Sequence, residues 1–234
     1  MSALDIRNLD VFYGRTQITH GVHLDVREGE SYALVGESGS GKSTVLKAVV
    51  GLAPEWKGAI SVFGQPRGHG IDRAFSRTCQ MVFQDPLASL NPKMTVGQIL
   101  AEPLRELCPE IPAEEHPRLV ARLLTRVGLL PDMVDRHPHE FSGGQAQRVA
   151  IARAVIARPD MLVADEPTGN LDPHLAQDVM QLFMRFNQVG VSVLVATHAV
   201  GLISRLPHRV IHIEKGSLEE RRKAELMEKT HDFS

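Results

Sequence analysis

A glycine-rich segment near the N-terminus has the residue types and the spacing of a phosphate-binding loop. It fits the pattern G-x-x-x-x-G-K-[ST] in full and reads Gly36-Glu37-Ser38-Gly39-Ser40-Gly41-Lys42-Ser43-Thr44. Glycines let the backbone approach a triphosphate closely enough for several N–H groups to converge on it. Lys42 adds a cation for the β and γ phosphates, and the Ser43 hydroxyl is a ligand suited to Mg²⁺. The segment therefore predicts a site for ATP and Mg²⁺.

Two acidic residues, Asp165 and Glu166, follow the apolar run of residues 161–164. At the end of a buried strand beside a phosphate loop, the carboxylate of Asp165 is placed to hold the Mg²⁺ shell. Glu166 would then face the γ-phosphate and orient or deprotonate the attacking water. Two solvated acids at a strand end are the plainer interpretation, and it is the phosphate loop that favours the catalytic one.

The elements that must position these groups follow from the hydrophobic pattern. Period-two alternation or short apolar runs indicate strands, and they cover residues 4–11, 22–26, 31–35, 59–64, 81–83, 161–164, 191–196 and 210–213. Helical patterns cover residues 44–51 and 175–186. Strands that alternate with helices predict an α/β fold whose mostly parallel sheet is covered on both faces. The phosphate loop then lies between a buried strand and a helix.

Residues 85–149 have a different character from the sequence on either side. They show no strand signal, contain a cluster of prolines, and carry apolar residues at helical spacing, namely Leu119, Leu123, Leu124 and Val127. This block predicts a helical insertion. Because the phosphate loop precedes it and the acidic pair follows it, we expect both motifs to serve one active site in one domain.

Composition limits the classes of protein that remain. The chain has 234 residues, 43% hydrophobic, and its apolar runs are far shorter than the ~20 residues of a membrane span. With no leader pattern at the N-terminus, we expect neither a membrane helix nor a secretory signal. Lys and Arg total 26 against 28 Asp and Glu, a balance that argues against coating nucleic acid. Cys79 and Cys108 suit a reduced cytoplasmic chain, and His137 and His139 lack the partners of a zinc site.

The segment Phe141-Ser142-Gly143-Gly144-Gln145-Ala146-Gln147-Arg148 resembles the signature motif of the ABC-type ATPases, and the resemblance covers nearly the whole chain. Ser142 and Gln145 have the S-x-x-Q form of a capping box, which predicts that a helix begins here. Its N-terminus, left open by Gly143 and Gly144, is a second candidate anion site. The resemblance implies that this site faces the phosphate loop of a second subunit in a head-to-tail dimer, with two ATP molecules between them.

The same resemblance implies roles for four further residues. Tyr13 would stack on adenine, although a buried aromatic is the alternative interpretation. Gln84 corresponds to the Q-loop residue that reaches Mg²⁺ and the attacking water. Asp172, in the segment Asn170-Leu171-Asp172, matches the D-loop, and His198 stands where the family has its switch histidine near the γ-phosphate.

The implied fold is that of an ABC ATPase, a phosphate-loop core with a mostly parallel sheet, N-terminal antiparallel strands and an inserted helical subdomain. Residues 1–84 and 150–218 would form the ATP-binding core, residues 85–149 the helical subdomain with the signature, and residues 219–234 a charged tail. One departure concerns the residue after the switch histidine, which is usually Asp in the family and is Ala199 here. We expect it to reduce the ATPase activity without abolishing it.

Two parts of the chain resemble different branches of that family. Residues 84–104 resemble the peptide and nickel uptake group, in the region where family members receive the coupling helix of a membrane subunit. Residues 164–172 and 186–190 resemble the cell-division and lipoprotein-release ATPases. We give more weight to the first, because the second part serves chemistry that all members share.

The sequence therefore predicts an enzyme, the ATP-hydrolysing subunit of a membrane transporter that imports peptides, nickel or a similar small solute. Expected partners are integral membrane permease subunits, docked near the Q-loop and helical subdomain, and a second ATPase subunit, with no nucleic acid. The expected location is cytoplasmic, peripheral on the inner face of the membrane. The alternative is a non-transport ABC ATPase, a mechanical or signalling module of the cell-division type or part of a soluble enzyme complex.

Overall fold

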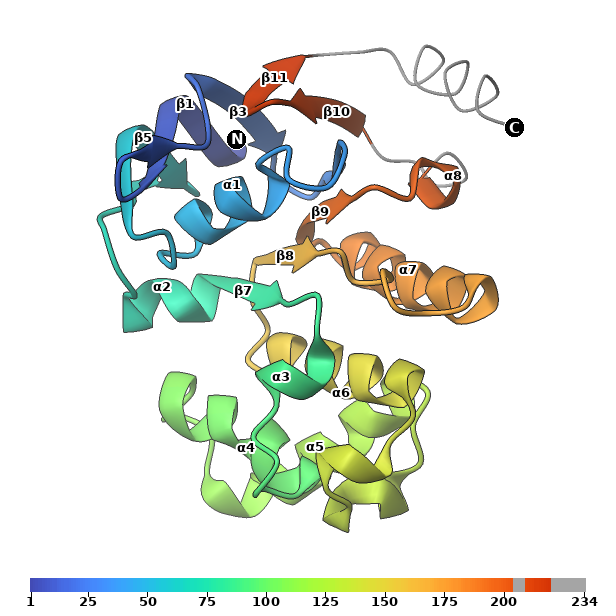
Figure 1. Ribbon diagram of the computed structural model, residues 1–234. Coiled ribbons are helices and arrows are strands. Elements are labelled where there is room, and N and C mark those ends of the chain that lie inside the picture. Colours follow the sequence, from blue (N-terminus) through green and yellow to red (C-terminus); the bar gives the residue numbers. More distant parts are fainter. Residues whose placement is uncertain (204–208, 220–234) are drawn as a thin grey trace.

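The structure is a computed structural model, and it describes residues 1–203 and 209–219. Two β-sheets lie at one end of the molecule and a group of helices at the other (Figure 1). The strands are β1 (Ser2–Tyr13), β2 (Thr16–Gln17), β3 (Val22–Arg27), β4 (Ser31–Val35), β5 (Glu55–Val62), β6 (Gln65–Pro66), β7 (Cys79–Val82), β8 (Met161–Asp165), β9 (Ser192–Thr197), β10 (Arg209–Glu214) and β11 (Ser217–Glu219). The helices are α1 (Lys42–Val49), α2 (Arg73–Thr78), α3 (Pro86–Ser89), α4 (Val96–Leu107), η1 (Ala113–Glu115), α5 (His116–Arg126), η2 (Pro131–Asp135), η3 (Pro138–Glu140), α6 (Gly143–Val155), α7 (Pro173–Gln188) and α8 (Val200–Ile203), where η marks a 3₁₀ turn.

The larger sheet carries the elements that bear the chemistry. Its strand order is β11-β10-β4-β9-β8-β7, and every pair from β10 to β7 is parallel, whereas β11 returns antiparallel to β10. This confirms the predicted mostly parallel sheet. Because parallel strands end at the same edge of a sheet, the loops that follow the neighbouring strands β4, β9 and β8 meet there.

The smaller sheet is antiparallel, with the order β2-β1-β5-β6 and with β3 paired to β1. In β3 the apolar residues Val22, Leu24 and Val26 are buried while the residues between them are exposed. This is the burial that period-two alternation predicts for a strand with one face on the core. The N-terminal antiparallel strands are thus confirmed.

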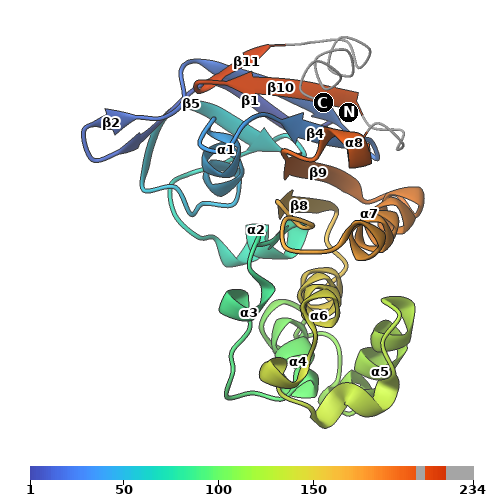
Figure 2. The ribbon, with the colours of Figure 1, turned by 45° about the vertical axis from the view of Figure 1, so that its right-hand side comes forward.

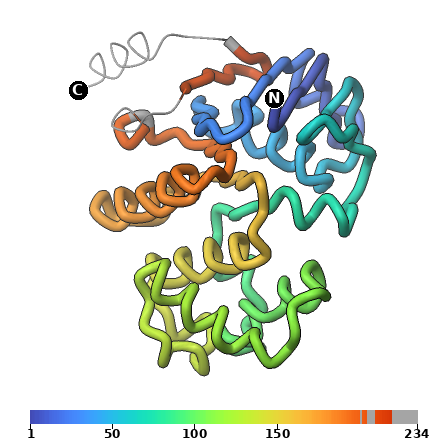
Figure 3. The backbone as a smooth tube through the Cα atoms, turned by 180° about the vertical axis from the view of Figure 1, so that it is seen from behind, coloured from blue at the N-terminus to red at the C-terminus, as the bar shows by residue number. Residues whose placement is uncertain are grey.

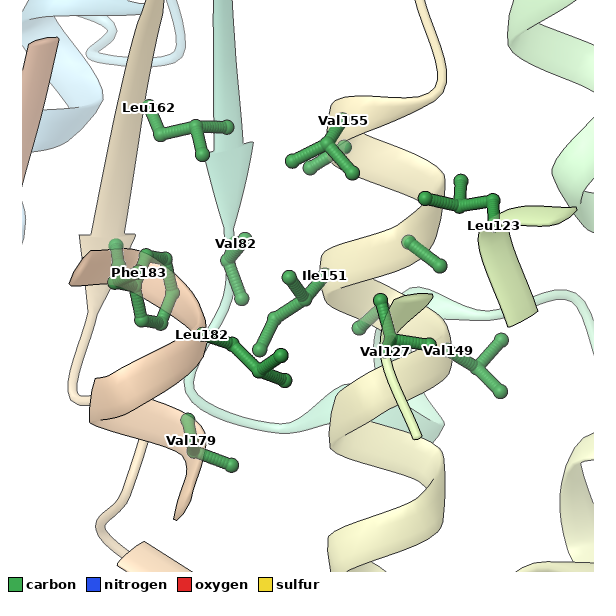
Figure 4. Packing of buried hydrophobic residues seen from close by; sticks show 14 of the residues in the cluster. Val82, Leu123, Val127, Val149, Ile151, Val155, Leu162, Val179, Leu182 and Phe183 are labelled. Atoms are coloured by element: carbon green, nitrogen blue, oxygen red, sulfur yellow. The ribbon is translucent and has the colours of Figure 1, made fainter. Parts of the chain in front are cut away.

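Two hydrophobic cores lie on opposite faces of the parallel sheet. Tyr32 and Leu34 of β4 face the core shared with α1 and the antiparallel sheet, whereas Ala33 and Val35 face the core shared with the helical part. Figure 4 shows the second core, where α6 packs between the sheet and α5, and α7 lies against the sheet. A strand buried on both faces reads as a continuous apolar run, as β4 does.

The helical part contains α3, α4, α5 and most of α6, which gather below the sheets in two views (Figures 1 and 2). Every element described between residues 85 and 149 is helical, which confirms the predicted insertion. Of the predicted apolar pattern, Leu123 and Leu124 are buried on α5 and Leu119 is half-buried there. Val127, just after the last residue of α5, is also buried. The view from behind shows α6 running back from this part toward the sheet (Figure 3). Since α6 continues to Val155, the boundary drawn after residue 149 falls inside a helix.

Several element boundaries differ from the predicted ones. Strand β5 begins at Glu55, earlier than residue 59, because it pairs with β1 as far as Phe12. It ends at Val62 because Phe63 has a positive φ of 48°. Helix α1 covers residues 42–49 rather than 44–51, since Gly51 turns left-handed. Helix α2 was not predicted, and the predicted charged tail of residues 219–234 lies outside the described residues apart from Glu219, which ends β11.

Among the helices within residues 1–203 and 209–219, none combines the length and the apolar character that crossing a membrane requires.

Candidate functional site

The phosphate loop joins β4 to α1 at the shared edge of the parallel sheet. Gly41 caps α1 with a φ of 106°, in the left-handed region that favours glycine. A Cβ added to Gly36 would stand 2.3 Å from the Ile213 carbonyl oxygen, so this position admits only glycine. Helix α1 begins at Lys42, directly after this cap, so its positive N-terminal end faces the loop. The loop is packed so closely against β10 that its path is fixed by the fold.

Lys42 is buried, with 4% of its surface exposed, and its ammonium group is held inside the loop. Its Nζ donates to the carbonyl oxygens of Gly36 at 2.8 Å and Glu37 at 2.9 Å. The same Nζ lies 3.3 Å from Oε1 of Glu166, in an ion pair whose two side chains are almost fully buried. The two groups predicted to act on the γ-phosphate thus contact each other directly.

Ser43 and Asp165 join the start of α1 to the end of β8. The Ser43 hydroxyl donates to Oδ1 of Asp165 at 2.8 Å. Burial raises the pKa of Asp165 above its ordinary value of 3.8, and the bond from Ser43 opposes that rise. A hydroxyl and a carboxylate side by side at the loop are two of the oxygen ligands that Mg²⁺ prefers.

Contacts with Lys42 and His198 hold the Glu166 side chain beside the phosphate loop. Its Oε2 accepts from the backbone N–H of His198 at 3.2 Å and lies 3.0 Å from Nδ1 of the same histidine. Its φ is 44°, an uncommon conformation for a residue with a side chain, and its N–H donates to the Ala196 carbonyl on β9. Strained backbone of this kind persists only where the surrounding structure holds it, and it is found most often at functional sites. His198 itself is more than half exposed, at 59% of its side chain.

Gln84 and Tyr13 approach the loop from other elements. Gln84 follows β7, and its Nε2 stands 3.8 Å from the position that a Cβ on Gly169 would take, beside the turn after Glu166. Tyr13 ends β1 at the hairpin with β2, and the residue is 41% exposed rather than buried. This exposure is compatible with stacking on a base.

The signature segment lies in the other half of the molecule. Ser142 caps α6 by accepting from the Gln145 N–H at 3.4 Å, and Oε1 of Gln145 accepts from the Ser142 N–H at 3.0 Å. The predicted capping box is thus confirmed. Gly143 is exposed and Gly144 is covered by Leu175. Helix α6 and helix α1 lie in different halves of the structure (Figures 1 and 2), so the chain does not bring the two candidate anion sites together.

Asp172 has a structural task that its family role did not include. It caps α7 by accepting from the N–H groups of His174 and Leu175, each at 3.1 Å. The residues that follow this cap pack on the signature helix, since Leu175 covers Gly144. The segment predicted to be the D-loop therefore lies beside the signature within the same chain.

A turn between β10 and β11 supports the phosphate loop and was not found in the sequence. The N–H of Gly216 donates to the Ser40 carbonyl at 2.9 Å, and the N–H of His20 donates to the Gly216 carbonyl at 2.8 Å. A Cβ on Gly216 would stand 2.1 Å from the Ile18 carbonyl. A glycine after a strand was the visible signal, but only the fold shows what it touches.

Two pairs of residues that could carry other chemistry have ordinary surroundings. Cys79 and Cys108 are both free and buried, and burial raises the pKa of the Cys79 thiol to about 12. His137 and Glu140 form a capping box on η3, and the rings of His137 and His139 stack. Among the described residues no group of three or more His, Cys, Asp or Glu side chains is placed to hold a metal ion.

The phosphate loop has one carboxylate hydrogen-bonded to its serine and a second carboxylate ion-paired with its lysine. This arrangement is that of a phosphate-loop nucleotide-binding protein. The family profile described as ABC transporter matches residues 19–169. The chain is 41% identical over 204 residues to the oligopeptide transport ATP-binding protein OppF of Escherichia coli strain K12, covering 86% of this chain and 61% of that protein. It is likewise 41% identical to a putative peptide import ATP-binding protein of Brucella abortus strain 2308, covering 85% of this chain and 61% of that protein. The chain belongs to the ABC transporter family.

The fold agrees with that assignment. The dimeric structure of the ATP-binding cassette MJ0796, bound to ADP and phosphate after hydrolysis, superposes with a TM-score of 0.81 at 27% identity, covering 94% of this chain and 99% of that one. The chain spans about three fifths of the length of the curated relatives named above.

Proposed function

We propose that this chain binds and hydrolyses ATP as the energy-supplying subunit of a membrane importer. The observation that carries the proposal is the contact of Lys42 with Glu166 and of Ser43 with Asp165 at one edge of the parallel sheet. These contacts bring a cation, a hydroxyl suited to Mg²⁺ and two carboxylates together at one phosphate loop. Membership of the ABC transporter family supports the same conclusion.

The phosphate loop would bind the triphosphate with its backbone and its lysine. Residues 36–44 offer N–H groups at the N-terminus of α1, where the helix dipole favours negative charge. To reach the phosphates, Nζ of Lys42 must move away from the Glu166 carboxylate or contact that carboxylate and the phosphates at once. In both cases phosphate binding would weaken the ion pair of Lys42 with Glu166, at the step where Glu166 is needed as a base. Tyr13, exposed at the β1–β2 hairpin, would stack on the adenine.

The oxygen groups at the loop fit a magnesium ion. Ser43 and Asp165 would hold it, with Gln84 reaching from the end of β7. Magnesium in nucleotide sites usually takes only one or two carboxylates from the protein, which agrees with the small number of acidic groups here. When bound, the ion neutralises charge on the transferring phosphoryl group.

Glu166 would act as the general base toward the attacking water. The backbone N–H of His198 fixes the Oε2 atom of Glu166, and the exposed His198 ring stays close to it for contact with the γ-phosphate. Phosphoryl transfer needs little covalent chemistry from the protein, so positioning and charge are what these residues supply.

The second half-site would come from another copy or a related subunit. Ser142, Gly143 and Gln145 at the N-terminus of α6 point to a second anion site that lies away from the chain's own phosphate loop. Pairing two such chains head to tail would complete each site, with Asp172 near the junction. The dimeric state of the similar cassette MJ0796 supports this arrangement.

The membrane partners would dock on the region that follows Gln84. Leu87 on α3 is 46% exposed, an apolar side chain in the segment that resembles the peptide and nickel uptake group. OppF of E. coli is by its name an oligopeptide transport protein, which supports a peptide or similar small solute as cargo. We place the chain on the cytoplasmic face of the membrane, with no nucleic acid as partner. We divide it into an ATP-binding core and a helical subdomain that meet within α6, followed by a charged tail after β11.

A nucleotide titration tests the first step of this proposal. Lys42→Ala should weaken ATP binding by about tenfold or more, because charge-assisted hydrogen bonds to phosphate are lost. Lys93→Ala is the control, since Lys93 is exposed and lies between α3 and α4 in the helical part. Equal ATP affinity in the two variants would refute the assignment of the loop. Copurification with a polytopic membrane protein then tests the transport role separately.

A further inference from the structure

A groove between the helical part and the core lies away from the groups described so far. Its walls come from α5, from the segment after α6, and from the C-terminal end of α7 with the turn that follows it. It has a volume of about 430 Å³, within the range of roughly 300–1,000 Å³ that is typical of small-molecule sites. None of the residues assigned above to nucleotide, metal or catalysis lines it.

The floor of this groove is apolar. Leu123 of α5 and Val155 and Ile156 at the end of α6 are each 8% exposed, so only a small face of each side chain is open. Figure 4 shows Leu123 and Val155 near the upper end of α6. On the opposite wall Val189 is 67% exposed beside the half-buried Phe186. An apolar body would bury these faces.

Three arginines surround that floor. Arg122 and Arg126 are one turn apart on α5, and Arg158 follows α6. All three are exposed, and within the described part of the chain none has a carboxylate at ion-pair distance. The only acidic residue among the lining residues is Asp160, which leaves the described walls with two positive charges in excess. Arg118, on the same helix outside the groove, is by contrast paired with Glu115 at 3.0 Å.

From this combination we infer that the groove binds a small organic anion, a carboxylate, sulfonate or phosphate attached to an apolar body. The arginine guanidinium groups would hold the anionic group, for which their planar forks are suited, and the floor would cover the apolar body. Because the walls belong to both the helical part and the core, the ligand would touch both at once. The inference does not depend on ATP hydrolysis.

Anilinonaphthalene sulfonate is a suitable probe, because it joins an aromatic body to one anionic group and fluoresces when its body is buried. Titration of the whole chain should give saturable binding. The double variant Arg122→Gln/Arg126→Gln should weaken that binding by about tenfold or more. The control Arg105→Gln/Arg118→Gln removes the same charge from exposed positions outside the groove and should leave the affinity unchanged.

Three further arms decide the interpretation. Phenylnaphthylamine, which has the same body without the sulfonate, should bind the wild type and the groove variant alike, and an equal loss of both probes would overturn the role of the arginine charges. Saturating ADP should not displace the sulfonate, and displacement would assign the probe to the phosphate loop. A fluorescence yield per chain that falls as protein concentration rises would mean that a second copy covers the groove, which would also overturn the inference.

Discussion

The phosphate-loop edge and the signature end of this chain are organised in opposite ways. At the first, Lys42, Asp165 and Glu166 are buried and bonded to one another or to the loop. At the second, Ser142 and Gly143 are exposed, and the hydrogen bonds of Ser142 stay within its own turn. The phosphate-loop edge is therefore assembled by the fold of one chain. The signature end is a preformed helix end, and we propose that it is completed by a group from outside the chain.

The largest expected effect is on ATP turnover, and it comes from a substitution at the buried phosphate-loop edge. Glu166→Gln keeps the shape of the side chain but removes the carboxylate that we propose as the base, so ATP turnover should fall by about 10²–10⁴-fold. Nucleotide should still bind, because the phosphate loop and the ammonium group of Lys42 are retained, although the ion pair of Lys42 with Glu166 is lost. Phosphate release and an ATP titration measure the two separately. Glu37→Gln, on the exposed part of the same loop, is the control, and turnover at the wild-type rate in Glu166→Gln would refute its role.

A second variant tests whether the turn between β10 and β11 supports the phosphate loop. Gly216→Ala would force a Cβ to 2.1 Å from the Ile18 carbonyl, so the turn under Ser40 must shift. We expect a loss of more than about 3 kcal/mol in the free energy of unfolding, together with weaker nucleotide binding. Gly190→Ala is the matched control, because Gly190 also has a positive φ but nothing lies within 4 Å of its Cβ. That control should cost about 1 kcal/mol, and denaturant titration compares the two.

The buried half should also respond to pH through Asp165. Since its pKa is raised in the folded state, its protonated form stabilises the fold fully below the ordinary value of 3.8, and this contribution is lost as pH rises through the folded pKa. Asp165→Asn is neutral at every pH and can still accept from Ser43. The nucleotide-free variant should therefore be more stable than the wild type above that window, with no advantage below it. If the difference in free energy of unfolding between Asp165→Asn and the wild type is the same at every pH, this prediction is wrong.

The smallest expected effect concerns the turn that follows β9 at the phosphate-loop edge. The N–H of Ala199 donates to Oγ1 of Thr197 at 3.1 Å, so the turn after His198 is held without the usual aspartate. Ala199→Asp should raise turnover by less than about tenfold, because less than ~1.4 kcal/mol is at stake. Steady-state hydrolysis measures it, and unchanged turnover would show that the substitution of Ala for Asp has no cost.

The sequence was sufficient where the determinant is local. The phosphate loop, the Ser142–Gln145 cap and strand β4 depend on residues close together in the chain, and each was predicted at its observed place. The ion pair of Lys42 with Glu166, the support of Ser40 by Gly216 and the early start of β5 depend on pairing between distant segments. Such contacts follow from the order of strands in the sheets, which the hydrophobic pattern alone does not determine.

Sedimentation of the Glu166→Gln variant with and without ATP tests the central claim most directly. If the two half-sites complete each other between copies, ATP should convert the 25.8 kDa chain into a species of about twice that mass. Adding Ser142→Arg, which blocks the exposed helix end, should abolish that conversion while ATP binding remains. A Glu166→Gln chain that binds ATP yet stays monomeric at every nucleotide concentration would contradict the pairing of two copies of this chain.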